Sequence, residues 1–180
     1  MKNQNTKKLA YAALFLALCL VLPMLTGQIP QIGSMLLPMH IPVLLCGLVC
    51  GWQYGAAVGF VAPLLRSVLF GMPPMYPVAI AMAFELLTYG LVIGLVYRRM
   101  AQKGAAGVYA ALLTAMVAGR LVCGVAEVVL LGLGGKAFTA QTFLAGALLN
   151  AVPGIIVQLV LIPAVMAVLQ KAGAVKEYAE

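Results

Sequence analysis

Long apolar runs follow one another along the chain, separated by short polar or Gly/Pro-rich stretches such as residues 51–55 and 71–77, which predict turns or loops. A helix that spans a membrane needs about 20 mainly apolar residues. Six runs approach or exceed that length, and the sequence predicts a helix in each: residues 9–25, 34–50, 56–70, 77–97, 105–133 and 142–169. We therefore predict an all-α integral membrane protein, a bundle of six transmembrane helices that forms a single domain over residues 1–180.

Composition supports a membrane environment. Hydrophobic residues make up 64% of the chain, charged residues 8%, and the mean hydropathy is +1.10. A soluble domain of this size has too little interior to hide so much apolar surface, so the lipid bilayer is the expected surroundings. The formal net charge is +7. We nevertheless expect no nucleic-acid partner, because the basic residues flank the apolar runs, as they do in membrane topology.

The flanking charges predict the orientation. With the amino terminus in the cytoplasm, only Lys136 among the flanking cations falls outside, and the others fall inside: Lys7, Lys8, Arg98, Arg99, Lys103, Lys171 and Lys176. An excess of Lys and Arg marks cytoplasmic loops. The sequence therefore predicts that both termini are cytoplasmic.

A few polar or ionisable residues interrupt the apolar runs. A charge within a membrane span costs several kcal/mol unless it faces protein or a wet cavity. At the helical rise of about 1.5 Å per residue, all of these residues except Arg120 fall in the outer half of the bilayer. We therefore expect a polar-walled cavity open to the outside, with six candidate substrate-binding residues: His40, Arg66, Glu85, Arg120, Glu127 and Asn150.

A purely structural interpretation of these residues stays open. Arg66 with Glu85, and Arg120 with Glu127 two turns further along one helix face, would form neutralising pairs. A lone His40 between prolines is often a hydrogen-bonded packing residue. Asn150 and Gln158 have the chemistry of interhelical contacts in membranes.

The sequence gives little support for a catalytic site or a metal-binding site. The chain has one His and no Asp, so an intramembrane hydrolase built on His40, Glu85 and Glu127 lacks an activated nucleophile or a metal-ligand set. The four cysteines lie inside apolar runs and are interpreted as reduced core residues. We expect no enzyme, metal or cofactor. Since no phosphate-binding loop ending in Lys-Ser/Thr occurs, ATP-driven transport needs another chain to hydrolyse ATP.

The first run contains a small-xxx-small pair, Ala13 and Ala17, near its cytoplasmic end. Small residues at this spacing let a second helix approach closely. The pair is a candidate partner interface.

The chain resembles the S components, the substrate-binding membrane subunits, of energy-coupling factor (ECF) transporters. The resemblance rests on its length, its six runs and basic flanks, and on several motifs: Ala13-x-x-x-Ala17, the stretch 36–44 (LLPMHIPVL), Gly47, Gly51, 63–66 (PLLR) and 85–90 (ELLTYG). It implies a bacterial plasma-membrane protein that binds a vitamin or related micronutrient from outside. It also implies delivery inward with a transmembrane T subunit, docked at Ala13 and Ala17, and a pair of cytoplasmic ATPases.

The resemblance does not identify which substrate the protein binds. Position 2 is Lys2, whereas nickel and cobalt members carry a metal-binding His there, so a metal substrate is disfavoured. Arg66 favours a vitamin with a carboxylate or phosphate, such as pantothenate, folates, biotin or nicotinate. Riboflavin, thiamin precursors and queuosine precursors stay open, as do a non-vitamin S component for a metal or nucleobase-like substrate and an accessory membrane subunit without a ligand.

Overall fold

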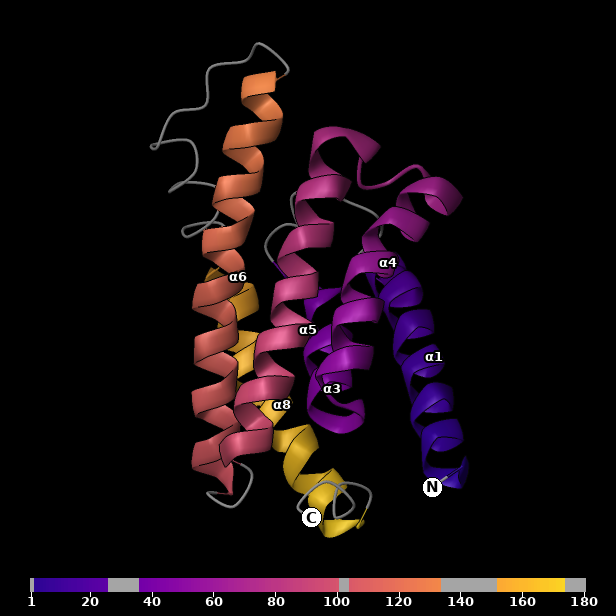
Figure 1. The fold of residues 1–180 in the computed structure, drawn as a ribbon, viewed down its shortest axis with the longest axis vertical. Helices are drawn as coiled ribbons and strands as arrows, with labels where there is room; N and C mark the ends of the chain where they lie inside the picture. Colours follow the sequence, from indigo (N-terminus) through magenta and orange to yellow (C-terminus); the bar gives the residue numbers. More distant parts are fainter. Residues whose placement is uncertain (1, 26–35, 101–103, 134–151, 174–180) are drawn as a thin grey trace.

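The computed structural model describes residues 2–25, 36–100, 104–133 and 152–173, and in these ranges it contains helices and no strand (Figure 1). Five of the helices are long and apolar enough to cross a membrane. The prediction of an all-helical protein with several membrane-length helices is thus confirmed for the described residues. The helices are α1 (Lys2–Leu25), α3 (His40–Cys50), α4 (Trp52–Phe70), α5 (Ile80–Met100) after a π-helical turn η1 (Met75–Ala79), α6 (Ala105–Leu133) and α8 (Val152–Lys171).

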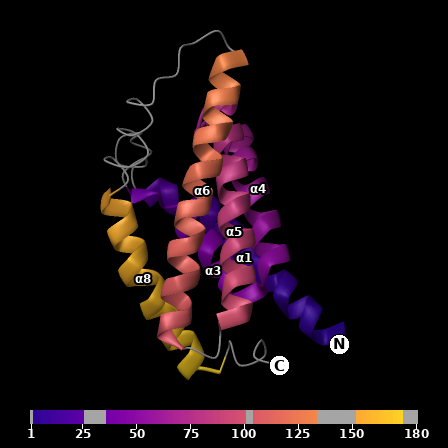
Figure 2. The same ribbon diagram turned by 60° about the vertical axis from the view of Figure 1, so that its left-hand side comes forward.

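The helices stand side by side, with α1 and α6 at opposite sides of the bundle (Figure 1). The start of α1, the end of α5, the start of α6 and the end of α8 lie toward the same end of the molecule (Figures 1 and 2). This arrangement is the one expected if the basic flanks share one side of a membrane. The count of six spans and the side on which the termini lie stay predictions.

The second apolar run forms a helix that is shorter than predicted. Instead of a helix over residues 34–50, the described part has α3 with 11 residues, beginning at His40. Leu37 adopts a left-handed conformation with φ 50°, and its carbonyl accepts a hydrogen bond from the His40 N–H at 3.0 Å. Pro38 explains the break, because the residue before a proline is disfavoured in the helical region. At ~1.5 Å per residue, α3 is about 16 Å long, too short to cross a bilayer.

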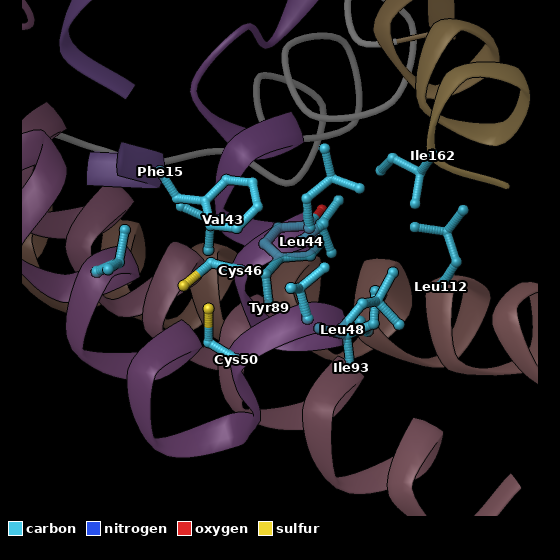
Figure 3. Close-up of a cluster of buried hydrophobic side chains, with 14 of the residues drawn as sticks. Phe15, Val43, Leu44, Cys46, Leu48, Cys50, Tyr89, Ile93, Leu112 and Ile162 are labelled. Carbon is cyan, nitrogen blue, oxygen red and sulfur yellow. The ribbon is translucent and has the colours of Figure 1, made fainter. Parts of the chain in front are cut away.

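This short helix is the centre of the bundle. Every residue from Pro42 to Cys50 is buried, and α3 contacts α1, α4, α5 and α8. A helix that is apolar on all sides needs neighbours on all sides, which is what the arrangement provides. Figure 3 shows the resulting core, in which α3 residues pack with side chains of α1, α5, α6 and α8: Phe15, Val43, Leu44, Cys46, Leu48, Cys50, Tyr89, Ile93, Leu112 and Ile162.

Glycines bring α3, α4 and α5 into backbone contact. A Cβ on Gly55 would lie 2.6 Å from the Gly47 Cα and 2.8 Å from the Gly90 carbonyl oxygen. Backbone atoms cannot move aside as a flexible side chain can, so these positions require glycine. The predicted turn over residues 51–55 is wrong in extent: Gly51 alone, with φ 95°, turns the chain, and α4 begins at Trp52.

Candidate functional site

Three of the predicted site residues come together from three helices. Glu85 of α5 lies at the centre, with its Oε1 3.1 Å from Arg120 Nη1 of α6 and 3.5 Å from His40 Nε2 of α3. His40 and Glu85 are only 1% and 2% exposed. Of the six candidate residues, His40, Glu85 and Arg120 thus lie together in the structure, and we call these three residues the charged cluster.

An aromatic ring bounds the charged cluster on one side. The Tyr89 ring, one turn after Glu85 on α5, contacts the His40 ring edge-to-face, with centroids 5.2 Å apart. Tyr89 also packs against α6, where a Cβ on Gly119 would lie 2.7 Å from its ring. Because Gly119 directly precedes Arg120, the close approach of Tyr89 fixes the position of α6 next to the cluster.

The polar atoms of the cluster are incompletely paired. Within the described part of the chain, several buried atoms have no hydrogen-bond partner: both ring nitrogens of His40, Oε1 of Glu85, Nε and Nη2 of Arg120, and Nε2 of Gln158. Neither the Arg120–Glu85 ion pair nor the His40–Glu85 contact has good hydrogen-bond geometry. Each unpaired buried group costs about 1–3 kcal/mol, so native proteins carry only a few of them. Five of the six atoms belong to His40, Glu85 and Arg120, which makes the charged cluster the candidate binding site.

Gln158 was expected from the sequence as an interhelical contact and not as a site residue. It lies on α8 and is 1% exposed. Ile162, one turn further on, packs in the same core as Leu44 of α3 (Figure 3). His40 precedes Leu44 by one turn, and α3 contacts α8, so Gln158 lies at the level of the charged cluster. A lone amide in an otherwise apolar run was the available signal.

Arg66 does not join the charged cluster. Its Nη1 donates a hydrogen bond to the Leu20 carbonyl of α1 at 2.5 Å, and its guanidinium lies over the Phe70 ring at 5.3 Å. The predicted pairing of Arg66 with Glu85 is wrong. Arg66 projects from α4 toward α1, while Glu85 projects from α5 toward α3 and α6, so the two groups face different interfaces.

Arg120 does not pair with Glu127, the partner on the same helix that the structural interpretation of the sequence offered. The ion-pair partner of Arg120 among the described residues is Glu85, not Glu127. Glu127 is partly exposed, two turns further along α6. Asn150 lies outside the described residues, and its role in the site stays a prediction.

The two alanines of α1 lie on the outer face of the bundle. Ala13 and Ala17 are exposed, whereas Ala12, Phe15 and Cys19 are buried against the neighbouring helices. The small-xxx-small pair is thus accessible to a second protein. Its role as a partner interface stays a prediction.

The cysteines are free and buried, and the Cys46 and Cys50 side chains of α3 lie next to each other in the core (Figure 3). In the described ranges, no three His, Cys, Asp or Glu side chains come close enough together to hold a metal ion.

The chain matches a known protein family. The family model described as "ECF transporter, substrate-specific component" matches residues 7–166, which include the charged cluster and Gln158. No curated protein and no solved structure matches the chain.

Proposed function

The chain belongs to the family of substrate-specific components of ECF transporters, and we propose that it binds a vitamin or related micronutrient at the charged cluster. Binding takes place from the outer side of a bacterial plasma membrane. The substrate then passes inward with the help of a transmembrane T subunit and a pair of cytoplasmic ATPases. As a member of this family the chain is a multi-pass transporter subunit.

The observation that carries the proposed binding site is the set of unpaired polar atoms on α3, α5, α6 and α8. A purely structural network would gain stability by pairing these atoms, since a partly satisfied buried network is less favourable than an apolar core. A polar ligand that bonds to them recovers this cost on binding. Small-molecule sites between helices commonly have this character, a few placed polar groups in apolar walls.

Partner binding is proposed for a different surface. Ala13 and Ala17 are exposed on α1, at the side of the bundle opposite to α6 (Figure 1). Small side chains allow close helix–helix approach in a membrane, so this face suits a transmembrane T subunit. Ligand binding and partner docking would then use separate residues.

The experiment that tests the proposed function is mass spectrometry of small molecules released from the purified wild-type protein. We expect a stoichiometric micronutrient from the wild type and from Arg98→Lys, a control at the exposed end of α5. The Glu85→Gln variant is expected to release much less of it. A protein that releases no small molecule, and that supports no micronutrient uptake when produced with a T subunit and ATPases, would refute the proposal.

A further inference from the structure

Arg120 contacts Glu85 through one nitrogen of its guanidinium. Its Nη1 lies 3.1 Å from Glu85 Oε1, whereas Nε and Nη2 are buried without a hydrogen-bond partner among the described residues. Nε and Nη2 lie on the same side of the planar group, and their N–H bonds point in nearly parallel directions. This edge is a fork that matches the two oxygens of a carboxylate.

We infer that the ligand carries a carboxylate that binds side-on to Nε and Nη2 of Arg120, and that Gln158 donates a further hydrogen bond to the same ligand. The inference rests on the proposed function, because it needs a small molecule at the charged cluster. It assigns the anion-binding role to Arg120 instead of Arg66. The Nη1 of Arg66 is already bonded to the Leu20 carbonyl.

Three of the six unpaired atoms require hydrogen-bond acceptors on the ligand. Arg120 Nε and Nη2 and Gln158 Nε2 are donors only. Gln158 is 1% exposed and belongs to α8, which contacts both α3 and α6. A ligand that satisfies these groups must therefore present acceptors to two different helices. Charge-assisted bonds are roughly twice as strong as neutral ones, which favours a carboxylate over a neutral carbonyl at Arg120.

Charge balance favours a carboxylate over a phosphate. The charges of Arg120 and Glu85 cancel within their ion pair. A carboxylate then adds one negative charge to a buried site, whereas a phosphate monoester adds about 1.5 to 2. Burial makes uncompensated charge costly, and the carboxylate of Glu127 two turns along α6 opposes a dianion further.

The experiment compares acids with their neutral counterparts by isothermal titration of the purified protein in detergent. The pairs are nicotinate with nicotinamide, biotin with biotinamide, and pantothenate with panthenol; 4′-phosphopantetheine is added as a phosphate that has no carboxylate. We expect one acid to bind and its neutral counterpart to bind about 10- to 150-fold more weakly, the range for a hydrogen bond to a charged group. Failure of every acid, equal affinity within a pair, or tighter binding of the phosphate would overturn the inference.

Two variants test which residues bind the carboxylate of the ligand. Arg120→Lys keeps the positive charge next to Glu85 but loses the fork, so it should weaken the acid by about 10- to 150-fold. Gln158→Leu should weaken it by about 2- to 13-fold, the range for a neutral hydrogen bond. The controls Arg98→Lys and Gln53→Leu make the same exchanges at exposed positions and should bind as the wild type does. Unchanged affinity in a folded Arg120→Lys variant would overturn the assignment to Arg120.

Failure of this inference is distinguishable from failure of the proposed function. A purified protein that releases a stoichiometric neutral molecule contradicts the carboxylate and leaves the transport function standing. If Arg120→Lys does not fold, the comparison of acids with neutral counterparts on the wild-type protein still decides between the two outcomes.

Discussion

The two faces of α5 are built in opposite ways. Toward α4, Gly90 meets the backbone of Gly55, so that the helices touch without side chains between them. Toward α3 and α6, Glu85 meets His40 and Arg120, and several polar atoms remain unpaired. The first interface is closed by close packing, and the second has polar atoms that the proposed ligand would bond to. One helix thus connects a close-packed support to the proposed binding site, and such support is what holds a binding site in a fixed geometry.

The largest loss of stability is expected where Gly55 of α4 meets Gly47 of α3 and Gly90 of α5. In Gly55→Leu the new side chain meets the backbone of Gly47 and Gly90, so we expect a loss of ~3 kcal/mol or more and little folded protein. A thiol-reactive dye that reports exposure of the four buried cysteines during heating measures this loss. The control is Gly132→Leu on α6, where a Cβ meets nothing within 4 Å. A stable Gly55→Leu variant would show that the interface is not close-packed.

The charged cluster should respond to the loss of a single member. Glu85→Ala leaves Arg120, whose side chain is 17% exposed, without its counter-ion and should cost about 3 kcal/mol, the lower end of the range for a buried pair. The double variant Glu85→Leu/Arg120→Met removes both charges and should regain most of that stability without regaining ligand binding. Thermal unfolding and ligand titration of both variants test this. A double variant as unstable as Glu85→Ala would show that the two charges do not act as a pair.

Arg66 should affect stability and not ligand affinity. Arg66→Met removes the bond to the Leu20 carbonyl and should cost about 1.5–3 kcal/mol, since the donor is charged. Ligand affinity should stay within error, because Arg66 faces α1. The matched control is Arg99→Met at the exposed end of α5. A loss of affinity without a loss of stability would return Arg66 to the ligand site.

Ala17→Trp should have the smallest effect on stability and binding. Ala17 is exposed on α1, so the larger side chain meets no part of the described bundle. Micronutrient uptake in cells should nevertheless be lost, because the indole prevents close approach of the T subunit. The control is Val160→Trp, at an exposed position of α8. Loss of ligand binding in Ala17→Trp would contradict the separation of docking surface and site.

A helix could be predicted from the sequence where its formation depends only on the residues within it. The fifth apolar run was expected over residues 105–133, and α6 covers Ala105–Leu133. Length and continuous hydrophobicity suffice to predict such a helix, because its backbone hydrogen bonds are all made within the helix. The break before His40 was harder to place, since the apolar run continues through it. It depends on how Pro38 acts on Leu37.

The candidate site was predictable as a list of residues but not as a set of pairs. Charges inside apolar runs stand out in the sequence, and His40, Glu85 and Arg120 were found for that reason. Helical periodicity says which residues share a face of one helix, but it does not say which helix that face meets. Only the tertiary structure decided that Glu85 pairs with Arg120 and that Arg66 bonds to α1, because those contacts depend on the order and rotation of neighbouring helices.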